Sequence, residues 1–288
     1  DSFFVRDPEV LWLQTPGYTR PADPRGMWGS EPLSINALGH RGPPMDRAKP
    51  AGMKRVLVLG GSQPFGMNVG GSETFAAVLQ RLLDAREPGH WQVLNGAVPG
   101  HSSFQVRQYV EHDAGALEPD VVVFDAGTND DLSLEPLYAA PDHEVQAAAL
   151  WSGEATEVAS GSAVYRLMRR ALAPVVALTR DSVRVPPARR IENIRRIQEL
   201  GAERGFEVLF LSQVYVEGDE TRPLAPRPAR CLYRYNELKP VADVCGLFTP
   251  MGMKAGTFFT DAIHTSPQGH VLIAELILGT MQEQGWVR

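Results

Sequence analysis

The chain has 288 residues, of which 43% are hydrophobic and 22% charged, and its formal net charge is −6. This composition is ordinary for a globular protein with a buried core. The acidic balance gives the chain no electrostatic reason to bind nucleic acid. No apolar run approaches the roughly 20 residues that a membrane-spanning helix needs.

Residues 1–53 are rich in proline, with eight of the 23 prolines of the chain. Proline lacks a backbone donor and restricts the residue before it, which excludes long helices here. The segment is too apolar for a disordered tail. We therefore predict an extended arm that packs on the main domain through Phe3, Phe4, Leu11, Trp12 and Trp28. Since the chain begins with Asp1 rather than Met, we expect an upstream segment to have been removed, and membrane association would come only through such a segment.

From Lys54 onward, short apolar runs alternate with stretches of helical periodicity. The apolar runs have the length and composition of buried strands. They cover 55–60 (RVLVLG), 91–95 (WQVLN), 120–125 (DVVVFD) and 206–212 (FEVLFLS). Strands that alternate with helices predict an α/β fold whose parallel sheet is covered on both faces.

The helices expected between these strands lie after Ser72, which is predicted to cap the first, near 104–114 and over 187–204. A last helix should begin with Ser266 as N-cap and Pro267 at its first position, and continue through Met281. The segment at about 132–185 is predicted to be a helical insert. It contains an amphipathic helix near 164–172, which we expect to pack on its own domain, with a membrane surface as the alternative.

The two cysteines, Cys231 and Cys245, permit two interpretations. A disulfide would close a short loop, contribute about 3 kcal/mol and require an oxidising compartment. Two buried free thiols fit the sequence equally well.

Four short motifs follow the predicted strands or precede the last helix. Each alone is typical of a turn or a helix cap. They contain Ser62 after the first strand, Gly100 after the second, Gly127-Thr128-Asn129-Asp130 after the third, and Asp261 with His264 before the last helix. In parallel sheets, functional residues gather in the loops beyond the carboxyl ends of the strands.

Together these motifs supply the parts that acyl transfer requires. A serine hydroxyl becomes a nucleophile when a histidine accepts its proton, and a carboxylate holds that imidazole in one tautomer. Ser62, His264 and Asp261 can fill these roles, and one local turn can hold Asp261 beside His264. The negative oxygen of the intermediate needs preorganised donors. The backbone N–H groups of Ser62 and Gly100 and the side-chain amide of Asn129 would provide three.

This set of residues resembles the SGNH (GDSL-like) hydrolase superfamily, over a region from about Arg55 to the C-terminal helix. The resemblance implies a flavodoxin-like three-layer α/β/α sandwich and esterase, lipase-like, thioesterase or carbohydrate-deacetylase activity, without a metal or cofactor. It implies Ser62 as nucleophile, Gly100 and Asn129 as oxyanion donors, His264 as base and Asp261 as its orienting carboxylate.

Two departures from the commoner family pattern stand out. Gly61 occupies the place where the family more often has aspartate, and we expect altered loop rigidity rather than loss of chemistry. The segment 35–43 (INALGHRGP) resembles a subset of bacterial SGNH proteins that are exported or anchored. We therefore expect a periplasmic, extracellular or membrane-anchored protein, with the cytoplasm as the alternative.

Two other site types fit the sequence poorly. The nucleophile elbow of α/β-hydrolases requires Gly-x-Ser-x-Gly, and Pro64 occupies its last position. Four side chains that could suggest a metal site lie on different elements without metal-ligand spacing. These are His90, His101, His112 and Asp113. His101 is expected to line the pocket, and His270 is expected to be structural.

The sequence thus predicts an arm over 1–53 and a hydrolase domain over 54–288. The predicted function is hydrolysis of a small-molecule or carbohydrate carboxyl ester through an acyl-enzyme on Ser62. One alternative is an O-acetyltransferase that acts on a polysaccharide with the same residues. Another is a catalytically silent binding or scaffold protein, to which Gly61 and the unusual QPFG continuation would point.

Overall fold

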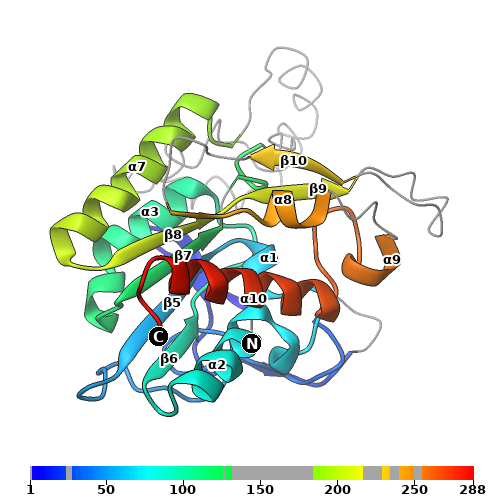
Figure 1. Cartoon of the computed structure of the whole chain (residues 1–288). Coiled ribbons are helices and arrows are strands. Elements are labelled where there is room, and N and C mark those ends of the chain that lie inside the picture. Colours follow the sequence, from blue (N-terminus) through cyan, green and yellow to red (C-terminus); the bar gives the residue numbers. More distant parts are fainter. Residues whose placement is uncertain are drawn as a thin grey trace, which may run out of the picture.

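A five-stranded parallel sheet lies at the centre of the computed structural model, in the order β11-β8-β7-β5-β6 (Figure 1). Every neighbouring pair in it is parallel. The strands are β5 (Lys54–Gly60), β6 (Trp91–Asn95), β7 (Val121–Asp125), β8 (Glu207–Leu211) and β11 (Val241–Ala242). The structure describes residues 2–23, 28–125, 127–131, 184–216, 229–233, 240–249 and 255–288. The helix expected near 164–172 lies outside these residues.

Helices cover both faces of the sheet, because its apolar side chains alternate. In β5, Val56 and Val58 face α2 (Phe75–Arg86) and α10 (Pro267–Glu283) within one hydrophobic cluster. Leu57 and Leu59 belong to a second cluster, on the side of α3 (Ser103–His112) and α7 (Pro187–Arg204). Figure 1 shows α10 in front of the sheet and α3 and α7 beyond it. The predicted three-layer α/β/α sandwich is confirmed.

One of the two predicted helix starts is correct. Ser266 caps α10 by accepting from the N–H of Gly269, and Pro267 follows it. The cap predicted for the first helix is wrong, because Thr74 caps α2 and accepts from the N–H of Ala77. Ser72 lies instead in a short 3-10 helix, Gly71–Glu73, where its N–H and hydroxyl both bind the carboxylate of Glu31.

Smaller elements complete the described chain. A 3-10 helix, Ala114–Leu117, follows α3, and β9 (Gln213–Val216) pairs antiparallel with β10 (Ala229–Tyr233). The helices α8 (Val244–Phe248) and α9 (Ala255–Phe258) precede α10. A disulfide between Cys231 and Cys245 joins β10 to α8, with 5.3 Å between the Cα atoms. None of the helices in the described ranges combines the length and the apolar character needed to cross a bilayer.

The described part of the arm contains short strands and no helix. Strand β1 (Phe4–Asp7) pairs with β2 (Leu11–Gln14), and β3 (Thr19–Arg20) pairs with β4 (Leu33–Ser34), both antiparallel. Phe3 and Trp28 pack against the cluster that contains Phe65. Phe4 differs from the expectation, since it is 39% exposed.

Arg55, a fully buried residue of β5, binds the end of the arm to the sheet. Its guanidinium donates to the backbone carbonyl oxygens of residues 46–48 and of Leu117, at 2.6 to 3.3 Å. Lys49 also forms an ion pair of 2.8 Å with Asp120, at the amino end of β7. The boundary between arm and domain at residue 53 stays a prediction from composition.

Candidate active site

The sheet order brings the predicted motifs to one edge. Strand β5 lies between β6 and β7. After β5 the chain forms β6 on one side of it, and it then crosses to form β7 on the other side. Such a switch point leaves a crevice at the carboxyl ends of the strands, where open α/β sheets bind ligands. Ser62 follows β5, Gly100 follows β6 and Asn129 follows β7.

Asp261, His264 and Ser62 form a continuous hydrogen-bonded chain. His264 Nδ1 lies 2.7 Å from Asp261 Oδ2, and His264 Nε2 lies 2.8 Å from Ser62 Oγ. Because an ionised carboxylate can only accept, Nδ1 carries the ring hydrogen. In the neutral imidazole, the lone pair of Nε2 is then directed at the Ser62 hydroxyl, which is the arrangement a general base requires.

The carboxylate of Asp261 is held in its ionised form. Its Oδ1 accepts from the backbone N–H groups of Ile263 and His264, at 2.9 and 2.8 Å. Burial alone would raise the pKa of Asp261, but the hydrogen bonds from the side chain and backbone of His264 outweigh it and lower the pKa to about 2. The three-residue spacing lets one turn supply both the backbone donors and the imidazole.

Asn68 supports the same carboxylate and was missed by the sequence analysis. Its Nδ2 donates to Asp261 Oδ2 at 3.1 Å and to Thr260 Oγ1 at 2.9 Å. Its backbone has a φ of +69°, a conformation that asparagine tolerates better than most residues. No motif around Asn68 indicates this contact, which spans almost 200 residues of the chain.

Gln63 joins the segment that carries Ser62 to the segment that carries His264, and the sequence analysis missed it as well. Its Nε2 donates to Thr265 Oγ1 at 3.0 Å, and its Oε1 accepts from the N–H of Thr265 at 3.1 Å. Gln63 follows Ser62 directly and Thr265 follows His264 directly. This pair of bonds therefore fixes the distance across which the proton would move.

The three predicted oxyanion donors differ in the partners of their N–H groups. In the described ranges, neither the backbone N–H of Ser62 nor that of Gly100 donates to a protein acceptor. Gly100 has a φ of +87°, which favours glycine. The amide of Asn129 uses one N–H on the carbonyl oxygen of His101, at 2.9 Å, which leaves a second N–H.

A pocket open to solvent is lined by both Ser62 and Asn129. His101 lines it too, as expected, whereas Gly100 is not among the described residues that do. Burial lowers the pKa of His101 to about 4, so the imidazole is neutral at pH 7.

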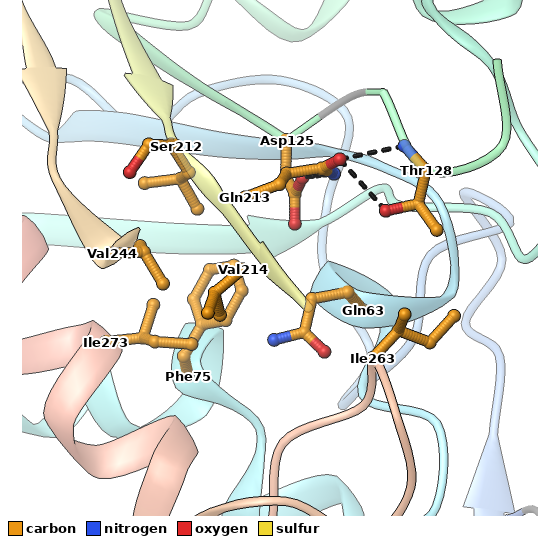
Figure 2. A pocket seen from close by; sticks show the side chains of 11 residues that line it. Gln63, Phe75, Asp125, Thr128, Ser212, Gln213, Val214, Val244, Ile263 and Ile273 are labelled. Atoms are coloured by element: carbon orange, nitrogen blue, oxygen red, sulfur yellow. Dashed lines mark hydrogen bonds between the residues drawn. The ribbon is translucent and has the colours of Figure 1, made fainter. Parts of the chain in front are cut away.

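A second pocket continues the first one and shares five lining residues with it: Gln63, Asp125, Thr128, Gln213 and Ile263. Figure 2 shows its polar end, where the side chain of Gln213 binds Asp125 and accepts from the N–H and the hydroxyl of Thr128. Its other end is apolar and includes Phe75 and Ile273 (Figure 2). Burial raises the pKa of Asp125 to about 7.

Asp130, the last residue of the Gly-Thr-Asn-Asp motif, anchors the turn that carries Asn129. Its Oδ1 accepts from the N–H of Ser103 at 2.7 Å, and its Oδ2 lies 3.2 Å from Arg190 Nε. The turn is thereby attached to α3 and α7. Burial raises the pKa of Asp130 to about 6, against the lowering effect of these contacts.

The remaining histidines have other environments. His270 is fully buried, and its Nδ1 accepts from the N–H of Phe75 at 3.1 Å, which joins α10 to the start of α2. His112 lies 3.6 Å from Glu9. Across the described ranges, no group of three or more His, Cys, Asp or Glu side chains is arranged to hold a metal ion.

The fold and this edge of the sheet define the class of SGNH-type α/β/α hydrolases. The model of the GDSL-like Lipase/Acylhydrolase family matches residues 58–272. The chain belongs to this family, and it is an SGNH-type hydrolase that acts on ester bonds.

Solved structures that are similar to this chain share little sequence with it. A catalytic mutant of Axe2, an acetylxylan esterase from Geobacillus stearothermophilus, has 15% identity and a TM-score of 0.50, covering 81% of this chain and 96% of its own. TesA has 16% identity and a TM-score of 0.48, covering 80% of this chain and 99% of its own. A comparison with curated proteins finds no match.

Proposed function

We propose that the protein hydrolyses carboxyl esters through an acyl-enzyme on Ser62. The observation that carries this proposal is the chain of contacts from Asp261 through His264 to Ser62, at 2.7 and 2.8 Å. A hydroxyl, an imidazole and a carboxylate in this order are the components of a serine triad.

In the proposed reaction, His264 Nε2 takes the proton of Ser62 as Ser62 Oγ attacks the acyl carbon. The negative oxygen that forms is stabilised by the N–H groups of Ser62 and Gly100 and by the amide of Asn129. The intermediate collapses to an ester on Ser62, and His264 gives its proton to the leaving alcohol. A water molecule, deprotonated by His264, then releases the acid and restores Ser62.

The substrate class we propose is a small-molecule or carbohydrate ester. Family membership supports ester hydrolysis in general, and the structurally similar Axe2 is an acetylxylan esterase. The same residues could also pass the acyl group to a sugar hydroxyl. If transfer occurs, adding an acceptor sugar should lower the amount of free acid released, while the rate at which the ester is consumed stays the same.

The test compares wild type with Ser62→Ala on p-nitrophenyl acetate, butyrate and octanoate, and on labelling by a fluorophosphonate. We expect turnover and labelling in wild type and neither in the variant, because the nucleophile is missing. Turnover that survives in Ser62→Ala contradicts the proposal. A folded wild type that neither turns over nor labels favours a catalytically silent protein.

We further propose that the protein works outside the cytoplasm, where disulfides persist. The Cys231–Cys245 disulfide supports this location. Cells lysed in N-ethylmaleimide should yield protein whose two cysteines become alkylated only after reduction. Alkylation of both without reduction would contradict it.

A further inference from the structure

The N-terminal arm contacts the loop that carries the oxyanion donor Gly100. Trp12 Nε1 donates to the carbonyl oxygen of Pro99 at 3.2 Å, and Gln14 Nε2 donates to that of Ala97 at 2.9 Å. His101 Nε2 lies 2.8 Å from the carbonyl oxygen of Trp12 and therefore donates to it. Strand β2 thus binds the loop before, beside and after Gly100.

The indole of Trp12 also lies directly against Gly100. A Cβ on Gly100 would be 3.2 Å from Trp12 Cζ2. The neighbouring residue Leu11 has a φ of +72° although it is not glycine, and it is buried with Phe104 and Val185. Such strain costs about 1–3 kcal/mol and persists only where the surroundings over-determine it. The packing of Leu11 therefore sets the direction in which the side chain of Trp12 projects from β2.

A second arm residue, Arg41, contacts the nucleophile segment. Its Nη1 donates to the carbonyl oxygens of Phe65 and Gly66, at 3.0 and 2.6 Å, and its Nη2 donates to that of Val69 at 2.7 Å. The guanidinium also lies 4.7 Å from the centre of the Phe65 ring. These carbonyls end α1 (Ser62–Phe65) and the turn after it.

The helix α1 needs such a partner because it is very short. It has four residues and begins with Ser62, and a helix of this length has no stability of its own. Arg41 is 5% exposed, so water cannot replace its hydrogen bonds without opening the core.

We infer that Trp12 and Arg41 are positioning residues of the active site: Trp12 fixes the oxyanion loop, and Arg41 fixes the turn that presents Ser62. The inference rests on the proposed function above. Preorganised donors lose their effect when they are displaced, and a shift of about 1 Å can cost about 100-fold in rate.

The experiment uses the full chain, four variants of Trp12 and Arg41, and one control variant elsewhere in the arm. Trp12→Ala removes the indole from Gly100, while Trp12→Phe keeps an aromatic ring at position 12 and removes the bond to Pro99. Arg41→Met removes all three hydrogen bonds that the guanidinium donates. Arg41→Lys keeps the positive charge but not the two nitrogen donors of the guanidinium. Lys49→Met is the matched control, because it breaks an arm contact of similar kind at the opposite end of β7.

The concentration of active sites is titrated with the fluorophosphonate. The kcat for p-nitrophenyl acetate is calculated per titrated site, and KM and Tm are measured for each variant. We expect Trp12→Ala and Arg41→Met to lower kcat about tenfold or more, at a KM within about twofold of wild type. The two milder variants should fall between these and wild type. Lys49→Met should lower Tm and leave kcat unchanged.

Two results would overturn the inference while the proposed function stands. One is a kcat within twofold of wild type in Trp12→Ala and Arg41→Met, with Ser62→Ala inactive. The other is an equal fall of kcat in Lys49→Met, which would mean that arm contacts act only through stability. If the stronger variants do not fold, Trp12→Phe and Arg41→Lys decide by the same criteria. Turnover in Ser62→Ala would instead overturn the proposed function, and this inference with it.

Discussion

Gly61 leaves the space in which the side chain of Asn129 lies. A Cβ atom on Gly61 would be 2.3 Å from Asn129 Nδ2 and 3.3 Å from the carbonyl oxygen of His101. Asn129 Nδ2 donates to that same carbonyl oxygen. The sequence alone suggested that Gly61 alters loop rigidity, and this contact gives the glycine a more specific consequence.

Gly61→Ala should therefore lower kcat at little cost in stability. The atom in the way is the end of a side chain, which can move, but the movement displaces a proposed oxyanion donor. Loss of one such donor typically costs about 10²–10³ in kcat. The control is Gly279→Ala in α10, where a Cβ meets nothing within 4 Å. A wild-type kcat in Gly61→Ala would contradict the role given to Asn129.

Asp261→Asn should lower kcat by about 10³–10⁴, as in other triads where the amide favours the wrong tautomer of histidine. Asn68→Ala should cost less than about tenfold, because the backbone donors of Ile263 and His264 still hold the carboxylate. Since the pKa of Asp261 is lowered to about 2, its protonation should not limit activity above about pH 4. Equal kcat in Asp261→Asn and wild type would exclude Asp261 from the triad.

The buried carboxyl of Asp125 should make the protein less stable as the pH rises. Its pKa is raised to about 7 by burial, against about 3.9 for an unfolded chain. Between these values the folded state holds a proton that the unfolded state releases. The contribution of Asp125 is therefore complete below about pH 4 and is lost as the pH rises to about 7.

Urea unfolding at pH 4.5, 6 and 8 checks this prediction. Relative to Asp125→Asn, the free energy of unfolding of wild type should fall by a few kcal/mol across the series. Asp84→Asn, which changes an exposed carboxylate of α2, is the control and should follow wild type. Parallel pH profiles of wild type and Asp125→Asn would show that Asp125 does not titrate in this range.

Reduction of the Cys231–Cys245 disulfide should lower Tm. The two cysteines are separated by 14 residues, and closing a loop of this length contributes about 3 kcal/mol. For a chain of this size that corresponds to about 5–10 °C. Thermal melts with and without a phosphine reductant measure the shift. The double variant Cys231→Ser, Cys245→Ser should not respond, and an equal response in it would assign the effect to another cause.

The parallel strands could be predicted from the sequence because each one is a local apolar run. The run 91–95 corresponds to β6 without any change of bounds, and 120–125 differs from β7 by one residue. The helix 187–204 also matches α7. These elements carry their signal within a single window of the chain.

The parts that could not be predicted depend on distant partners. Ser72 has the chemistry of an N-cap, but Glu31 takes its hydroxyl, and the sequence does not pair these two residues. Trp12 reads as one of several apolar anchors, although its partner Pro99 is 87 residues away. Ser62, His264 and Asp261 could be predicted as candidates because acyl transfer requires those side-chain types. The residues that support them can be of many types, because they need only fit the space and hydrogen-bonding groups of a distant partner.

The buried guanidinium of Arg55 makes the arm and the sheet a single cooperative unit. Its hydrogen bonds end on carbonyl oxygens of residues 46–48, and the residue itself has no exposed surface. A chain that began at Lys54 would keep the charge in the first core strand and lose these acceptors. The guanidinium would keep its bonds to the carbonyl oxygen of Leu117 and to the side chain of Gln92, but buried donors left unsatisfied destabilise the folded state. The change of composition near residue 53 is therefore a poor place to shorten the protein, and heating should melt arm and sheet in one transition.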